Sequence, residues 1–228
     1  MWKCKEVDNP KNNYLEFRVY HVDKNKGGVR LRENKEKDLH NLATTKRKLK
    51  ELLRLNINQN SCMLTLTYKE NMQDYNQAHK DLVKFIKRLN YKVYGTKKNN
   101  IKYLAVKELQ KRGAIHYHMV IFSKEVTDLK TKDIKKIWTL GKQVIKKDIE
   151  FDIDAPDRIS NYLAKYLVNM KKGQLIESGK KLYDCSKNLI RVQERELDLD
   201  SKGMDLIIEN SAVCVDGFGM KKCLYVKN

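Results

Sequence analysis

Two histidines separated by one residue stand inside an apolar segment, Ile-His-Tyr-His-Met-Val-Ile, at residues 115–121. In an extended strand alternate side chains point to the same face, so His116 and His118 would present two neighbouring imidazoles. Imidazole is a common metal ligand, although a single histidine on a half-buried strand is usually a core or surface residue. The chain has only 5 histidines. The pair is therefore a candidate metal site.

A carboxylate is expected to join the two imidazoles. Strands are predicted over residues 101–108 and 115–122, with Gly113 in the turn between them. In such a hairpin Glu108 lies across from His116, with both side chains on one face. One carboxylate and two imidazoles leave positions open for water and phosphate oxygens. The set suits Mn²⁺ or Mg²⁺, and the imidazoles favour Mn²⁺ or another transition ion.

A helix predicted over residues 155–171 supplies candidate nucleophiles. Tyr166 falls near the centre of its apolar face and Tyr162 at the polar border, so a core role is the stronger alternative for Tyr166. Tyr162 is therefore the favoured attacking phenol. An ordinary phenol has a pKa near 10 and needs a cation or base beside it. Lys165 could supply that charge, or be one more surface lysine.

The charge of the chain indicates a polyanionic partner. Its 228 residues include 48 Lys and Arg against 29 Asp and Glu, a formal net charge of +19. An excess this large favours nucleic acid over a merely solubilising surface. An anionic membrane is disfavoured, because no basic amphipathic segment carries Trp, Phe and Leu on its other face. We expect no membrane partner.

Targeting and redox signals are weak. The first residues do not resemble a signal peptide, and no apolar run approaches the ~18 residues of a membrane-spanning helix. The 5 cysteines are scattered without a Cys-x-x-Cys pair. They indicate reduced thiols in the cytoplasm of a bacterial host, and they disfavour a zinc ribbon.

The remaining pattern predicts an α+β fold with a central antiparallel sheet of about five strands flanked by helices. Further strands are expected at residues 15–22, 63–68 and 149–153, and helices at residues 35–55 and 77–92. The helix at 35–55 has a basic face that could touch phosphates, although a solvated face is the commoner explanation. Short strand-like pieces follow at residues 181–183, 206–208 and 223–226.

The chain has 2 prolines and no obvious linker, so its division rests on pattern alone. We expect an N-terminal strand and basic helix in residues 1–56. A nuclease core would occupy residues 57–172. A C-terminal extension of unknown role would occupy residues 173–228. His79, inside the helix at 77–92, is expected to be structural rather than a ligand.

Taken in order, these segments resemble the HUH endonucleases, specifically the rolling-circle replication initiators of small plasmids and single-stranded DNA phages. Three motifs and one later segment carry the resemblance: Met63-Leu-Thr-Leu-Thr-Tyr68, Glu108 with His116-Tyr117-His118, Tyr162-Leu-Ala-Lys165-Tyr166, and Lys181-Leu-Tyr-Asp-Cys-Ser186. Each is weak alone, and their order, spacing and basic context make the match fairly specific. The match covers roughly residues 60 to 190.

The resemblance implies a palm-like sheet with the two histidines on a middle strand and the tyrosine helix over them. It implies that a tyrosine attacks a phosphodiester of single-stranded or hairpin origin DNA, giving a 5′-phosphotyrosine link and a free 3′-OH. In members with two tyrosines the second phenol serves the terminating strand transfer, a role that would fall to Tyr166. A host helicase and a DNA polymerase are the further partners, since no Gly-x-x-x-x-Gly-Lys-Ser/Thr loop occurs in the chain.

Three alternatives stay open. The first is a metal-dependent nuclease that uses bound water and forms no covalent intermediate. The second is a transposase or relaxase with the same site chemistry, although relaxases more often carry three histidines. The third is a noncatalytic DNA-binding protein whose charge supplies affinity through counterion release. The sequence leaves open the origin, the metal, the oligomeric state and the kind of replicon.

Overall fold

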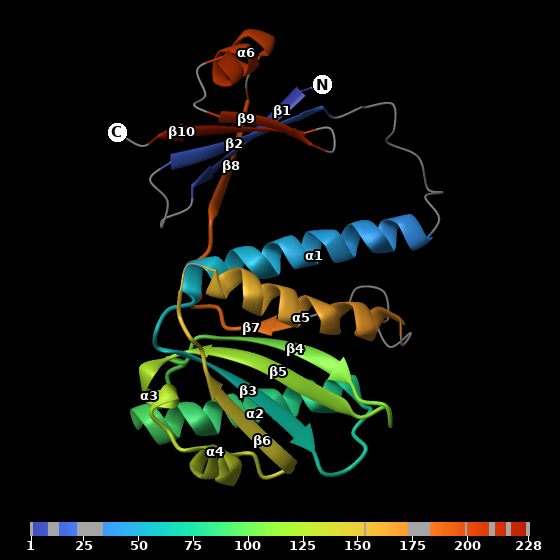
Figure 1. The fold of residues 1–228 in the computed structure, drawn as a ribbon, viewed down its shortest axis with the longest axis vertical. Helices are drawn as coiled ribbons and strands as arrows, with labels where there is room; N and C mark the ends of the chain where they lie inside the picture. The colour runs from blue at the N-terminus through green and yellow to red at the C-terminus, as the bar shows by residue number, and fades with distance from the viewer. Residues whose placement is uncertain are drawn as a thin grey trace. The chain divides into compact units, whose positions relative to one another are not determined.

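Two antiparallel β-sheets with their helices make up the computed structural model of the chain (Figure 1). The structure describes residues 2–8, 14–21, 34–152, 154–172, 183–198, 200–209, 213–217 and 220–226. The chain divides into two compact units. One is residues 40–189, and the other combines residues 1–39 with residues 190–228.

The unit of residues 40–189 holds the predicted sheet. All of its strand pairs are antiparallel. In spatial order its strands are β6 (Gly141–Asp148), β3 (Ser61–Tyr68), β5 (Ile115–Phe122), β4 (Tyr103–Leu109) and β7 (Tyr183–Cys185). The expected α+β class, with a five-stranded antiparallel sheet flanked by helices, is confirmed.

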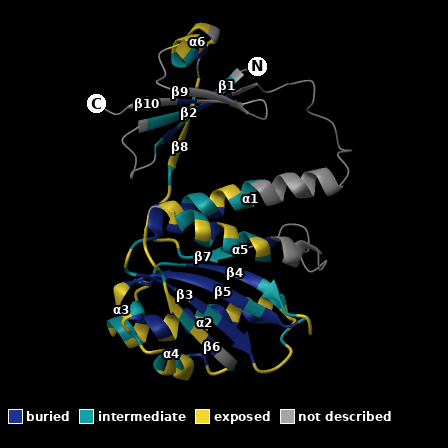
Figure 2. Cartoon of the chain, in the orientation of Figure 1, coloured by how far each residue is buried: buried dark blue, intermediate teal, exposed yellow. Residues whose placement is uncertain are grey.

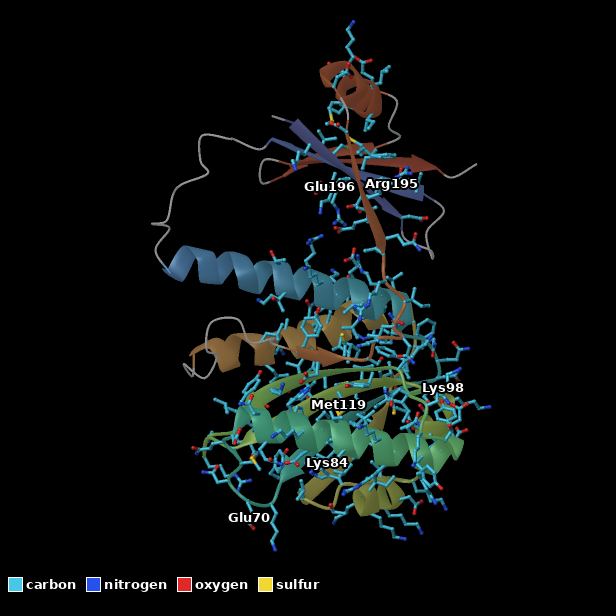
Figure 3. All side chains as sticks on the ribbon, turned by 180° about the vertical axis from the view of Figure 1, so that it is seen from behind. Glu70, Lys84, Lys98, Met119, Arg195 and Glu196 are labelled. Atoms are coloured by element: carbon cyan, nitrogen blue, oxygen red, sulfur yellow. The ribbon has the colours of Figure 1, made fainter. Side chains whose placement is uncertain are left out.

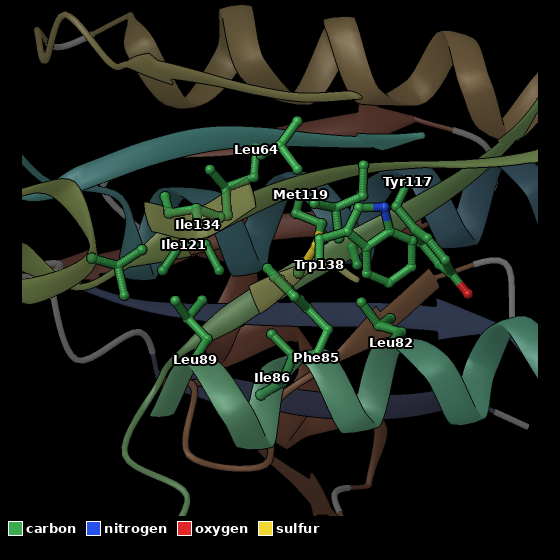
Figure 4. Close-up of a cluster of buried hydrophobic side chains, with 14 of the residues drawn as sticks. Leu64, Leu82, Phe85, Ile86, Leu89, Tyr117, Met119, Ile121, Ile134 and Trp138 are labelled. Carbon is green, nitrogen blue, oxygen red and sulfur yellow. The ribbon is translucent and has the colours of Figure 1, made fainter. Parts of the chain in front are cut away.

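One face of this sheet is covered by α2 (Tyr75–Tyr94), with the short helices α3 (Lys124–Thr127) and α4 (Thr131–Ile137) beside it. Alternation along β5 sends Tyr117, Met119 and Ile121 to this face. There they join the apolar side chains of α2 and Trp138 in one buried cluster (Figure 4). The strands of this sheet are mostly buried, whereas the helices expose one side to solvent (Figure 2).

Capping residues set the ends of α2. The Asp74 side chain accepts hydrogen bonds from the backbone N–H groups of Asn76 and Gln77, which the first turn leaves without helical partners. At the other end Gly95 adopts a left-handed conformation with φ of 63° and donates its N–H to the Tyr91 carbonyl.

The opposite face of the sheet carries α5 (Ala155–Lys172) and the part of α1 (Asn34–Asn56) that belongs to this unit. Leu163 and Leu167 of α5 are fully buried in a second apolar cluster that also includes Leu49 and Leu53 of α1. The Arg54 guanidinium donates two hydrogen bonds to the Asp157 carboxylate, at 3.0 and 2.9 Å. Both contacts hold α5 over β4 and β5.

The second unit contains another five-stranded antiparallel sheet. Its strands, in spatial order, are β8 (Gln193–Leu197), β1 (Trp2–Asp8), β2 (Tyr14–His21), β10 (Met220–Val226) and β9 (Val213–Gly217). Helix α6 (Ser201–Glu209) adds Met204 to a small core with Cys4 and Val19. The sheet thus combines strands from both ends of the chain.

Two local predictions are wrong. The strand expected at residues 149–153 lies earlier, at β6, and the described residues after it are not a strand; Phe151 is exposed. Residues 206–208 belong to helix α6, because Met204 and Ile207 recur at helical spacing toward the small core. Part of the piece expected at 181–183 lies outside the described residues. The segments 1–56, 57–172 and 173–228 stay a prediction.

Within the described residues, no helix is both long and apolar enough to cross a membrane.

Candidate active site

The hairpin formed by β4 and β5 positions the predicted ligands. Glu108 pairs with His116 across the strands, as expected from the sequence. Gly113, with φ of 83°, supplies the left-handed residue of the turn. On the other side of β5, Thr67 pairs with His116 and Thr65 with His118. The two imidazoles, the carboxylate and the two hydroxyls therefore share one face of the sheet.

His118 lies at the centre of these contacts. Its side chain is buried, and its Nε2 lies 2.8 Å from Oε2 of Glu108. Its Nδ1 lies 3.5 Å from Oγ1 of Thr65. An ionised Glu108 can only accept, so Nε2 of His118 carries the proton and donates it. The ring stacks on His116, with centroids 4.7 Å apart and planes at 11°.

His116 is oriented by the turn. Nε2 of Gln110 lies 3.0 Å from Nδ1 of His116, and the other end of the Gln110 amide accepts a hydrogen bond from Nε of Arg112. Arg112 also donates to the carbonyls of Tyr68 and Lys69 at the end of β3. This chain fixes the amide so that Nδ1 of His116 accepts. Nε2 of His116 is buried without a hydrogen-bond partner among the described residues.

Burial sets the protonation state of these groups. It lowers the pKa of His118 to about 4. It also lowers the pKa of His116 to about 4, where the charge of His118 acts in the same direction and that of Glu108 against it. Burial raises the pKa of Glu108, although the His116 charge opposes that change. Both imidazoles are thus neutral at pH 7, and the Glu108–His118 contact is a hydrogen bond rather than an ion pair.

Helix α5 brings both candidate tyrosines onto His118. The Tyr166 ring stacks on the imidazole, with centroids 3.8 Å apart and planes at 5°. The Tyr162 ring meets the same imidazole edge to face at 5.8 Å, and it meets Tyr166 at 5.1 Å. Both side chains are half-buried. Because they are one helical turn apart, one face of α5 presents both phenols to the histidine face of the sheet.

The two tyrosines differ in environment. Burial raises the pKa of Tyr166, and the hydroxyl of Tyr162 and the charge of Glu108 raise it further. Lys165 is exposed, and no hydrogen bond or ion pair joins it to another described residue. The structure therefore brings Glu108, His116, His118, Tyr162 and Tyr166 together and leaves Lys165 at the surface.

The donor set fits a divalent cation in its chemistry. Two neutral imidazoles and a carboxylate are available, Glu108 and His118 are already in contact, and Nε2 of His116 lacks a partner. In the described part of the chain, however, no three His, Cys, Asp or Glu side chains converge as they would around one ion. The side chains would have to turn toward a common point, and binding would release the Nε2 proton of His118.

Sequence reasoning gave no role to Gln110, Arg112 or Thr65. Alternation along β3 could have placed Thr65 on the histidine face, since its segment was already predicted to be a strand. The contact of Gln110 with His116 depends on side-chain directions within the turn, and no sequence pattern specifies these.

Residues 61–172 match the family model described as Replication-associated protein ORF2. The matched segment is just under half of the chain. It runs from the start of β3 to the end of α5 and contains all six candidate site residues. This part of the chain is therefore similar to replication-associated proteins.

Two further comparisons add little. The crystal structure of the hypothetical protein ORF119 from Sulfolobus islandicus rod-shaped virus 1 is similar at 18% sequence identity and a TM-score of 0.35. The similarity covers 57% of this chain and 93% of that one, and it is too weak to carry an argument. Comparison with the curated proteins gives no match.

Proposed function

We propose that this chain nicks and rejoins one DNA strand at a replication origin through a tyrosine. The observation that carries the proposal is the stacking of two α5 phenols on the imidazole of His118, beside Glu108. A nucleophile and a set of metal-ligating groups in contact are what phosphoryl transfer to a side chain requires. The family match of residues 61–172 adds the link to replication.

The reaction would be a transesterification. A tyrosine oxygen attacks phosphorus, the new oxygen–phosphorus bond forms, and the bond from phosphorus to the 3′ oxygen breaks. The phenol loses its proton and the 3′ oxygen gains one, so no water is consumed. The products are a 5′-phosphotyrosine and a 3′-OH that a DNA polymerase could extend. Since the number of phosphoester bonds is unchanged, the reverse step reseals the strand.

Glu108, His116 and His118 would hold the divalent cation, Mn²⁺ or Mg²⁺. When bound, such an ion polarises the phosphoryl oxygens and orients the phosphate. Neutral imidazoles suit this role, because protonated ones would repel the ion. The hydrogen bonds from Gln110 and Thr65 to the Nδ1 atoms keep the two rings in register with the carboxylate.

Tyr162 would attack first and Tyr166 would act in the second strand transfer. The raised pKa of Tyr166 makes its phenol the poorer nucleophile near neutral pH. Lys165, exposed on the same helix, would reach the phosphate only when DNA lies along α5. Its contribution would be electrostatic.

The test is a covalent adduct on a denaturing gel. The full chain is mixed with Mn²⁺ and a single-stranded oligonucleotide carrying the origin hairpin of its replicon. We expect an SDS-stable protein–DNA adduct that is lost in Tyr162→Phe and absent in the double variant with Tyr166→Phe. Tyr103→Phe is the matched control, because Tyr103 is also partly buried but packs in the α2 cluster.

Other results would replace the proposal. Full cleavage by the double Phe variant, without any adduct, would indicate a nuclease that uses water as nucleophile. Salt-sensitive DNA binding with no cleavage in Mn²⁺ would indicate a noncatalytic DNA-binding protein.

A further inference from the structure

The outer face of α2 carries positive charge and no negative charge. Its exposed residues are Asn76, His79, Lys80, Lys84, Lys87, Arg88, Tyr91 and Lys92. The one acidic residue of the helix, Asp81, is buried, and it accepts hydrogen bonds from Tyr68 and Gln77. The exposed cations of α2 therefore have no carboxylate on their own helix.

Five of these side chains form a narrow row, called here the α2 stripe: Lys80, Lys84, Lys87, Arg88 and Tyr91. At 100° per residue they lie within about 100° of one another, and from first to last they span about 17 Å of helix. Figure 3 shows Lys84 on the outer side of α2, away from the sheet. The stripe is thus a straight row of donors on a rigid helix.

The charges of the stripe are available to a ligand. No ion pair engages Lys80, Lys84 or Lys87 among the residues that the structure describes. Nη1 of Arg88 donates to Oγ1 of Thr139, which lies just after α4. Helix α4 extends the basic surface with exposed Lys132 and Lys135.

The stripe and the candidate active site lie on opposite sides of one sheet. α2 packs on the face of Tyr117 and Met119, whereas His116 and His118 point to the face that α5 covers. The sheet and the α2 layer therefore separate the two surfaces. DNA held by the stripe would be a different segment from the strand at the tyrosines.

We propose that the α2 stripe binds the phosphates of duplex DNA next to the single-stranded origin segment. The word origin rests on the proposed function, and binding of duplex DNA does not. Lysine, arginine and tyrosine side chains are common donors to DNA phosphates. A row of about 17 Å matches about five base pairs at 3.4 Å each.

Other polyanions fit the stripe less well. Proteins that bind single strands stack successive bases on several aromatic rings, whereas the stripe exposes one, Tyr91. A membrane-surface helix needs exposed Trp, Phe or Leu beside its cations, and the exposed positions of α2 hold none.

The test is the salt dependence of binding to a blunt duplex, measured by fluorescence anisotropy with the full chain in chelator. The variant Lys84→Gln/Lys87→Gln/Arg88→Gln is compared with Lys46→Gln/Arg47→Gln/Lys48→Gln. Each removes two lysines and one arginine, and the control positions lie on α1. We expect the slope of log K against log salt to fall by about 2 to 3 in the α2 variant, at about 0.9 per lost contact. The control slope should change by less than about 1.

Two further readouts keep the result clear. The double variant Lys84→Gln/Lys87→Gln should lose about 1.8 of the slope if its fold is intact, which gives a second point from a milder change. The α2 variant should still form the adduct on a short single-stranded oligonucleotide. If the wild-type chain forms no adduct but the duplex slope falls as expected, the nicking proposal fails and the stripe proposal stands.

Equal losses in the α2 and α1 variants would overturn the proposal, since overall charge would then explain binding. A loss on single-stranded DNA without a loss on the duplex would also overturn it. So would unchanged duplex binding together with lost binding to vesicles of anionic lipid.

Discussion

His118 is the residue on which three elements converge. Glu108 of β4, Thr65 of β3 and both tyrosines of α5 contact its ring. Only 5% of the residue is exposed, so protonation would place a charge in an apolar setting. The same holds for its stacked neighbour, His116. These rings are therefore neutral ligands above pH 4 and a source of acid sensitivity below pH 6.5.

The first prediction concerns stability against pH. Unfolded histidines titrate near 6.5, whereas burial lowers the pKa of His116 and His118 to about 4 in the folded chain. Between these values the unfolded chain binds more protons, so the free energy of unfolding falls as pH drops from about 6.5 to about 4. We expect a loss on the order of 2 kcal/mol over this window. Urea denaturation in chelator at several pH values measures it.

The control is the double variant His116→Gln/His118→Gln, which cannot take up these protons. The raised pKa of Glu108 acts in the opposite sense and is common to both proteins. The difference between their pH profiles therefore isolates the histidines. Parallel profiles for the two proteins would show that the imidazoles are not buried as described.

At the scale of elements, short-range rules predicted the pieces that position the site. Alternation, the Gly113 turn and the start of α5 at Ala155 follow from neighbouring residues. Strand β6 was missed because it is an edge strand rich in lysine, where apolar alternation is weak. The second sheet was missed because β1 pairs with β8, and no local pattern encodes a pairing between the two ends of a chain.

The docking of β7 on β4 depends on a buried ion pair. Lys107 is 1% exposed, and its ammonium contacts the carboxylate of Asp184 and lies 4.3 Å above the Tyr75 ring. The other carboxylate oxygen of Asp184 lies 3.0 Å from Nδ1 of His79. His79 thus has a structural contact, as expected. Removing one partner would leave a buried charge uncompensated.

The second prediction is a mutant cycle on this pair. Asp184→Ala should destabilise the chain by about 3 kcal/mol, because it leaves Lys107 charged and buried. Lys107→Met combined with Asp184→Leu should cost much less than Asp184→Ala, because no buried charge remains. His79→Ala, a change at a half-exposed ring, should cost under about 1 kcal/mol. Urea denaturation gives all three values, and an Asp184→Ala cost no larger than that of His79→Ala would contradict the assignment.

At the scale of the whole molecule, each apolar cluster is confined to one unit. Two clusters consist of residues between positions 40 and 189, and the third joins β1, β2 and α6. The candidate ligands, the tyrosines and the α2 stripe all fall within residues 40–189. A unit with its own core meets the main physical condition for folding alone.

The third prediction follows from that condition. A fragment of residues 34–189, which keeps α1 whole, should fold cooperatively and form the tyrosine adduct on a short single-stranded oligonucleotide in Mn²⁺. Its duplex binding should still respond to Lys84→Gln/Lys87→Gln/Arg88→Gln, since the stripe lies within it. Circular dichroism with thermal melting, the denaturing gel and anisotropy give the three readouts. A folded fragment that binds duplex DNA but forms no adduct, where the full chain does, would place a residue required for nicking within positions 1–33 or 190–228.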